Sequence, residues 1–131
     1  MITTGLYAAL TAILIIALAY RVVQFRRSHK AGMGDNASKD FQVAIRAHAN
    51  LVENAPMFLI LMALAEYRGT SQLVVHAGGI LFLLSRLAHA RGFFGTRGGY
   101  SKGRFYGTGM TWLLILMFAL INIYAFVQDA I

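Results

Sequence analysis

The sequence predicts an all-α fold, a four-helix bundle that spans a membrane as a single domain of residues 1–131. Hydrophobic residues make up 58% of the chain and charged residues 13%, whereas a soluble domain usually carries about 25% charged residues. The mean hydropathy is +0.61. Long apolar segments alternate with short polar connectors, and the length leaves no room for a second domain.

The first helix is predicted at about residues 6–27. Its apolar run extends to about Val23, which is long enough for a bilayer that needs ~20 residues. Residues 1–5 lack the basic region of a signal peptide, and no small-residue cleavage pattern ends the run. We therefore expect the helix to be retained and to emerge into water through Arg26 and Arg27.

The second helix is predicted at about residues 41–67, after a polar connector at about 28–40 with Ser38 or Asp40 as N-cap. Its first half is amphipathic and its second half is apolar throughout. Pro56 lies inside it and removes one backbone hydrogen bond, so a kink is expected there. A tight turn at residues 66–70 follows.

The third and fourth helices are predicted at about residues 71–93 and 104–128. Gly78 and Gly79 would let a neighbouring helix approach the third one closely. Asn122 in the fourth is expected to hydrogen-bond to another helix.

The formal net charge is +7, but the basic residues fall into two blocks around the first and third connectors. Lys and Arg concentrate in the cytoplasmic loops of membrane proteins, so the pattern favours loop topology over nucleic-acid binding. We predict that both basic connectors are cytoplasmic and both termini outside. The blocks consist of Arg21, Arg26, Arg27, Lys30, Lys39 and Arg46, and of Arg86, Arg91, Arg97, Lys102 and Arg104.

Polar residues at the cytoplasmic ends of the helices form the candidate site. Arg46, Asn50 and Glu53 are spaced i, i+4 and i+7, so they share one helical face. Such groups at the edge of hydrocarbon are costly and usually functional. The same membrane level is predicted for Arg26, Arg27, Arg86, His89 and Arg104.

This set is rich in cations and contains one carboxylate, which suits a small ligand with carboxylates and an ammonium group. Hydrocarbon lies beside it, so a lipophilic second substrate could arrive from the bilayer. Cysteine is absent, so any thiol must come from a ligand. The His and Glu spacings match no closed metal site, and we predict no bound metal.

The run from Arg46 to Pro56, RAHANLVENAP, resembles the second-helix motif of the MAPEG family, the membrane-associated proteins in eicosanoid and glutathione metabolism. That motif is Arg, three residues, Asn, two residues, Glu, two residues, Pro. Arg86-Leu-Ala-His89 followed by Phe93 resembles the third-helix motif of the same family, particularly its prostaglandin E synthase branch. The similarity covers nearly the whole chain.

The resemblance implies a bacterial-type member in the inner membrane or an equivalent one, assembled as a homotrimer with glutathione between adjacent subunits. Arg104 best matches the arginine that activates the thiol. Because the connector before it is about two residues longer than in the prostaglandin branch, Lys102 is the alternative. The residues implied to bind glutathione are Arg26 or Arg27, Arg46, Asn50, Glu53, Arg86, His89 and Phe93.

The function so implied is glutathione transferase or peroxidase activity on lipophilic electrophiles or lipid hydroperoxides. Asn54 and Phe93 stand where relatives often have Tyr, which keeps open a non-enzymatic lipid- or glutathione-binding scaffold. A small drug exporter is disfavoured, because no carboxylate lies at the midplane of a span.

Simpler interpretations of the polar residues also remain open. Arg46 and Glu53 could pair in a structural network, Arg86 could contact lipid phosphate, and His89 could be an ordinary interfacial histidine.

Overall fold

The computed structural model describes residues 1–35 and 38–130, which form four helices and no strand. Residues 36 and 37 of the predicted first connector, and residue 131, lie outside the described part. The helices confirm the all-α prediction, and each is long and apolar enough to cross a membrane. They are α1 (Ile2–Ser28), α2 (Lys39–Tyr67), α3 (Gln72–Gly95) and α4 (Lys102–Ala130).

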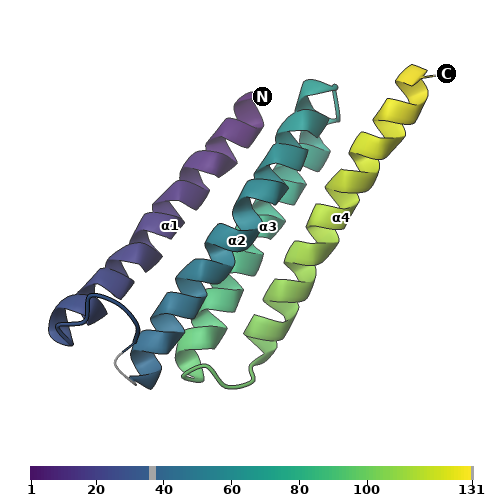
Figure 1. Ribbon diagram of the computed structural model, residues 1–131. Helices are drawn as coiled ribbons and strands as arrows, with labels where there is room; N and C mark the ends of the chain where they lie inside the picture. Colours follow the sequence, from purple (N-terminus) through teal and green to yellow (C-terminus); the bar gives the residue numbers. More distant parts are fainter. Residues whose placement is uncertain (36–37, 131) are drawn as a thin grey trace.

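The helices run side by side, and α1 and α4 lie on the flanks (Figure 1). Helices α2 and α3 contact each other and both flanking helices. The two termini lie at one end of the bundle, and the two basic connectors lie together at the other. This arrangement brings the polar ends of α2 and α3 to the same level.

Three phenylalanines in contact with one another form the centre of the core. The ring centroids of Phe58 and Phe82 are 4.1 Å apart, and Phe118 meets Phe58 edge-on at 5.6 Å. A Cβ at Gly78 would lie 2.4 Å from the Phe118 ring, and one at Gly79 would lie 2.3 Å from Tyr7. The predicted close approach at this glycine pair is therefore confirmed, because only glycine leaves room for both rings.

Glu66 departs from the prediction, which placed it in the turn after the second helix. It lies in the last turn of α2, only 7% exposed. Its carboxylate accepts hydrogen bonds from the backbone N–H groups of Thr3 (3.0 Å) and Thr4 (2.8 Å) and from the Thr4 hydroxyl (2.6 Å). A carboxylate can accept hydrogen bonds from the N–H groups that have no partner at the start of a helix. With Glu66 in this position, α1 begins at Ile2, four residues earlier than predicted.

Two other predictions concern side chains that form hydrogen bonds with backbone groups. The Ser38 hydroxyl accepts a hydrogen bond from the Phe41 N–H at 3.4 Å, which confirms Ser38 as the N-cap of α2. Asn122 donates to the carbonyl oxygen of Leu61 in α2 at 2.9 Å, so its predicted role between helices is confirmed. Helix α2 continues through Pro56.

Candidate functional site

Arg86 is the buried centre of the polar end of the bundle, with 2% of its surface exposed. Its Nη1 donates to Asn50 Oδ1 on α2 at 2.7 Å, and its Nη2 donates to the Gly107 carbonyl oxygen on α4 at 2.7 Å. One guanidinium therefore joins α2, α3 and α4. The suggestion that Arg86 contacts lipid phosphate is wrong, because the side chain points into the protein.

Close contact between α3 and α4 makes this arrangement possible. A Cβ at Gly107 would lie 2.6 Å from the Ser85 carbonyl oxygen, and one at Gly103 would lie 2.8 Å from the Ala88 carbonyl oxygen. The buried hydroxyls of Ser85 and Thr111 hydrogen-bond to each other at 2.9 Å across the same contact. The sequence analysis missed these residues, although glycines spaced four apart at the start of the fourth helix were a usable signal.

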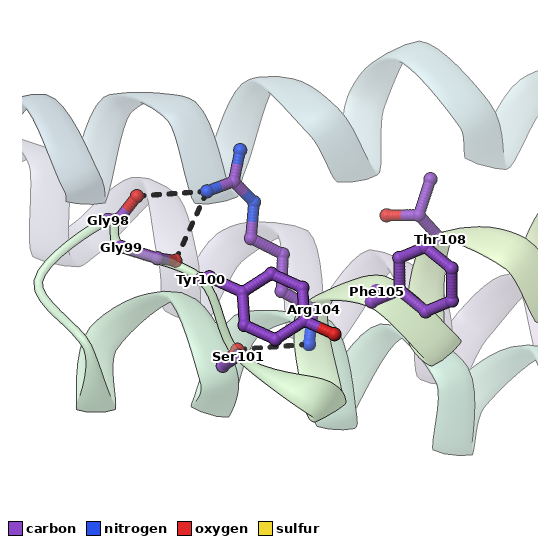
Figure 2. Close-up of a pocket in the computed structure, with 7 residues that line it drawn as sticks. All are labelled: Gly98, Gly99, Tyr100, Ser101, Arg104, Phe105 and Thr108. Carbon is purple, nitrogen blue, oxygen red and sulfur yellow. Dashed lines mark hydrogen bonds between the residues drawn. The ribbon is translucent and has the colours of Figure 1, made fainter.

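Arg104 is one of the residues that line a cavity of about 420 Å³, called here the Arg104 cavity. Its guanidinium lies 4.3 Å from the centre of the Phe93 ring, and its Nη1 donates to the carbonyl oxygens of Gly98 (2.9 Å) and Gly99 (3.3 Å). Figure 2 shows the carbonyl groups converging on this nitrogen. The cavity is lined by Gly98, Gly99, Tyr100, Ser101, Arg104, Phe105 and Thr108.

The connector before α4 has left-handed backbone at two residues and helps to hold Arg104 in place. Arg97 has φ of 50° and Gly98 has φ of 84°, both in the left-handed region that favours glycine. The Ser101 hydroxyl accepts a hydrogen bond from the Arg104 N–H at 3.2 Å. Lys102, the alternative activating residue, is exposed and is not among the residues that line the Arg104 cavity.

Phe93 and His89 are both buried on α3 beneath Arg104. Their ring centroids are 5.4 Å apart. Phe93 offers its face to the guanidinium, a favourable arrangement because the ring face is electron-rich. Phe93 therefore helps to position Arg104.

The predicted face of the second helix divides into two parts. Asn50 is half-buried and turned toward Arg86, whereas the Arg46 and Glu53 side chains are 61% and 56% exposed. Arg46 Nη1 lies 3.8 Å from Glu53 Oε1. An exposed ion pair contributes at most about 1 kcal/mol, so this contact leaves both groups accessible to a partner.

The two arginines predicted from the first helix differ in their surroundings. Arg26 donates to the Gly32 carbonyl oxygen at 2.7 Å, and its guanidinium lies 5.6 Å from the centre of the Phe41 ring. Phe41 in turn stacks on Phe25 at 5.7 Å. Arg27 is exposed at the end of α1. Arg26 thus fixes the first connector, and Arg27 is the more accessible of the two.

A second cavity, of about 210 Å³, lies along the start of α2 and is called here the cationic cavity. Arg97 lines this cavity and forms a bidentate ion pair with Asp40. Its Nε donates to Oδ1 at 2.7 Å and its Nη2 donates to Oδ2 at 3.0 Å. These hydrogen bonds and the negative charge of Asp40 raise the pKa of Arg97. The lining residues are Lys39, Gln42, Val43, Arg46, Phe93, Arg97 and Gly98.

In the described part of the chain, no three His, Asp or Glu side chains are grouped so that they could hold a metal ion. The residues predicted for the site supply guanidinium groups, one imidazole (His89), one amide (Asn50) and one carboxylate (Glu53).

Comparison with known proteins agrees with the motifs. The profile of the MAPEG family matches residues 4–124. The chain is 33% identical over 121 residues to the inner membrane protein YecN of Escherichia coli strain K12, an alignment that covers 92% of this chain and 90% of the relative. The YecN protein of Escherichia coli O6:H1 matches with the same identity and coverage.

Proposed function

Because the chain belongs to the MAPEG family and is an integral multi-pass membrane protein, we propose that it is a glutathione-dependent transferase or peroxidase. Its substrates are lipophilic electrophiles or lipid hydroperoxides. The observation that carries the proposal is Arg104, held over Phe93 beside an open cavity with exposed Phe105 on its wall.

Arg104 acts electrostatically in this reaction, because an arginine stays protonated and cannot be a base. A thiol has an ordinary pKa of about 8.5, and a guanidinium beside the sulfur favours the thiolate. The thiolate then attacks the electrophilic carbon of a substrate, forms a thioether and displaces the leaving group with its electron pair.

With a hydroperoxide, the thiolate attacks the terminal oxygen and breaks the O–O bond. The sulfur is oxidised to a sulfenic acid, and the alkoxide leaves and takes up a proton. A second glutathione converts the sulfenic acid to a disulfide and releases water. Two thiols and one hydroperoxide thus give one disulfide, one alcohol and one water.

The remaining side chains hold the tripeptide. The exposed guanidinium groups of Arg27 and Arg46 suit its carboxylates, and Glu53 suits its ammonium group. Asn50 presents its amide beside them, fixed by the hydrogen bond from Arg86. We assign Arg86 and Phe93 to positioning, since the first orients Asn50 and the second supports Arg104.

The positive-inside rule supports an orientation with both basic connectors in the cytoplasm and both termini outside. The clustering of these connectors at one end of the bundle is compatible with that orientation (Figure 1). Glutathione would then reach the site from the cytoplasm, and the lipophilic substrate would reach it from the bilayer.

We propose that three chains assemble, as the family resemblance implies, and the exposed Arg46 and Glu53 of a membrane-spanning bundle support contact with a neighbouring subunit. Charged groups that face lipid are costly, and a neighbouring subunit would shield them. Mass measurement in mild detergent should therefore give three times the 14.4 kDa of one chain. A monomer that binds glutathione and turns over substrate would contradict a site shared between subunits.

Glu53→Gln tests the binding of glutathione directly, because it removes the negative charge while keeping the size of the side chain. We expect the affinity to fall about 10- to 150-fold, equivalent to about 1.5–3 kcal/mol for a hydrogen bond to a charged group. Calorimetric titration of the purified oligomer measures this change. Asp129→Asn, at the opposite end of the bundle, is the control and should bind normally.

Unchanged affinity in an intact Glu53→Gln oligomer would instead support a purely structural role for the pair with Arg46.

The second candidate function is a non-enzymatic lipid- or glutathione-binding scaffold. It is favoured by Phe93, which offers no hydroxyl to a ligand and is covered by Arg104. Glutathione binding without turnover of a generic electrophile such as chlorodinitrobenzene would select the scaffold.

A further inference from the structure

We propose that the hydroxyl of Thr108 donates a hydrogen bond to the leaving oxygen of a hydroperoxide and so specialises the Arg104 cavity for hydroperoxides over carbon electrophiles. The inference rests on the proposed function and chooses between its two reactions. Thr108 is then a catalytic residue, because its hydroxyl touches an atom of the bond that breaks. Its role differs from that of Arg104, which acts on the sulfur.

The Arg104 cavity has a charged end and a neutral end. Nη1 of Arg104 is held toward the preceding connector by the carbonyl oxygens of Gly98 and Gly99. Thr108 lines the same cavity one turn later in α4, about 6 Å farther along the helix axis. In Figure 2 its hydroxyl oxygen lies on the side of the residue that faces Arg104. A reacting group between the two residues would have the guanidinium on one side and the hydroxyl on the other.

The Thr108 hydroxyl is free to act as a donor, unlike the hydroxyls of Thr11 and Thr111. A threonine in a helix often donates to the carbonyl oxygen four residues earlier, as Thr11 does to Tyr7 and Thr111 does to Gly107. Within residues 1–35 and 38–130, no hydrogen bond involves the hydroxyl of Thr108, which is half-buried. A lipophilic substrate would displace water from this group, and a buried donor without a partner is costly. The cavity therefore favours a substrate that brings an oxygen acceptor.

The two substrates reach the cavity from opposite ends. In the proposed orientation α4 begins at the cytoplasmic surface, so Thr108 lies deeper in the bilayer than Arg104. Glutathione arrives from the cytoplasm and places its sulfur beside Arg104. The lipophilic substrate arrives from the bilayer along the exposed ring of Phe105, which lines the same cavity. The hydroxyl is thus on the side of the substrate and not on the side of the tripeptide.

The leaving oxygen is the atom that gains negative charge in the peroxidase reaction. As the thiolate attacks the terminal oxygen, the S–O bond forms and the O–O bond breaks, and its electron pair moves to the oxygen bonded to carbon. Thr108 donates to this oxygen and keeps its own proton, while water supplies the proton that completes the alcohol. A preorganised donor aimed at developing charge lowers the barrier. A chloride that leaves a carbon electrophile accepts hydrogen bonds more weakly and gains less.

Thr108→Val tests this assignment, because valine keeps the shape of threonine and removes the hydroxyl. The assay measures kcat/KM of the purified oligomer, with glutathione, for cumene hydroperoxide and for benzyl chloride. We expect the value for the hydroperoxide to fall about 10²-fold, the lower end of the usual cost of losing one donor to a developing oxyanion. The value for benzyl chloride and the ultraviolet signal of the bound thiolate should stay unchanged.

Three further variants serve as controls. Thr108→Ser restores a hydroxyl and should keep most of the hydroperoxide activity. Thr108→Ala removes the same hydroxyl with a smaller side chain, and it replaces Thr108→Val if valine disturbs the fold. Thr70→Val changes another half-buried threonine, in the turn between α2 and α3 at the opposite end of the bundle, and should keep both activities.

The ratio of the two activities separates failure of this inference from failure of the proposed function. Equal loss of both activities in Thr108→Val would overturn the inference, since it would assign the hydroxyl to the sulfur or to the fold. Unchanged hydroperoxide turnover in that variant would overturn it as well. A native oligomer that consumes benzyl chloride but no hydroperoxide would overturn the inference and leave the transferase function in place. Absence of both activities would overturn the proposed function together with the inference.

Discussion

Replacing Arg86 with leucine should destabilise the folded protein by about 1–3 kcal/mol. The substitution removes the guanidinium that donates to Asn50 Oδ1 and to the Gly107 carbonyl oxygen, both at 2.7 Å. The Gly107 oxygen keeps a hydrogen bond from the Thr111 hydroxyl, so Asn50 Oδ1 is the acceptor that loses its partner. A buried acceptor left without a partner costs about 1–3 kcal/mol. Equilibrium unfolding in detergent micelles, followed by circular dichroism, measures the loss.

Arg91→Leu is the matched control for Arg86→Leu, because Arg91 lies on the same helix and is exposed. It should change the free energy of unfolding by less than about 0.5 kcal/mol. Adding Asn50→Leu to Arg86→Leu should recover part of the loss, because replacing both partners by apolar groups removes one unpaired acceptor. A fully stable Arg86→Leu protein would contradict the structural importance of the network.

The helices of this protein could be predicted from hydropathy, because each span is marked by an apolar run and ends in a polar connector. The start of the first helix could not be predicted in this way. Helix α1 starts at Ile2 because Glu66 binds its first N–H groups, and the two segments are more than sixty residues apart in sequence. No local cap precedes Thr3, so only the folded bundle reveals the start.

The sequence predicted which polar residues lie at this end of the bundle, but not the contacts between them. Spacing correctly placed Arg86, His89 and Phe93 on one face of a helix, and all three are buried there. Spacing could not show that Arg86 reaches Asn50 and a backbone carbonyl, because that contact needs the close α3–α4 approach at Gly107. Helical periodicity says nothing about a partner on another helix.

The position of Arg104 depends on a segment that has no periodicity at all. The turn before α4 uses left-handed backbone at Arg97 and Gly98, and this conformation directs the Gly98 carbonyl oxygen toward Arg104. Apart from the family resemblance, no pattern in the sequence distinguishes Arg104 from Lys102 as the activating residue. In the structure, Arg104 is packed against Phe93, whereas Lys102 is exposed and does not line the Arg104 cavity.

Arg104→Ala should abolish thiolate formation by bound glutathione and reduce turnover about 10²- to 10³-fold, the usual effect of removing one preorganised group that stabilises developing negative charge. Glutathione affinity should fall much less, because the substitution leaves Arg46 and Glu53, the residues proposed to bind the ends of the tripeptide, unchanged. Ultraviolet difference spectra near neutral pH report the thiolate. Lys102→Ala is the matched control and should retain most of the signal.

The pH dependence of turnover distinguishes this role from a structural one. If Arg104 lowers the thiol pKa as proposed, the rate of the native protein should already be near its plateau at neutral pH. In Arg104→Ala the thiol returns toward its ordinary pKa of about 8.5, so the rate should keep rising until the pH exceeds that value. If Lys102→Ala produces this shift and Arg104→Ala does not, Lys102 is the activating residue. If the native protein binds glutathione and forms no thiolate, the scaffold function replaces the enzymatic one.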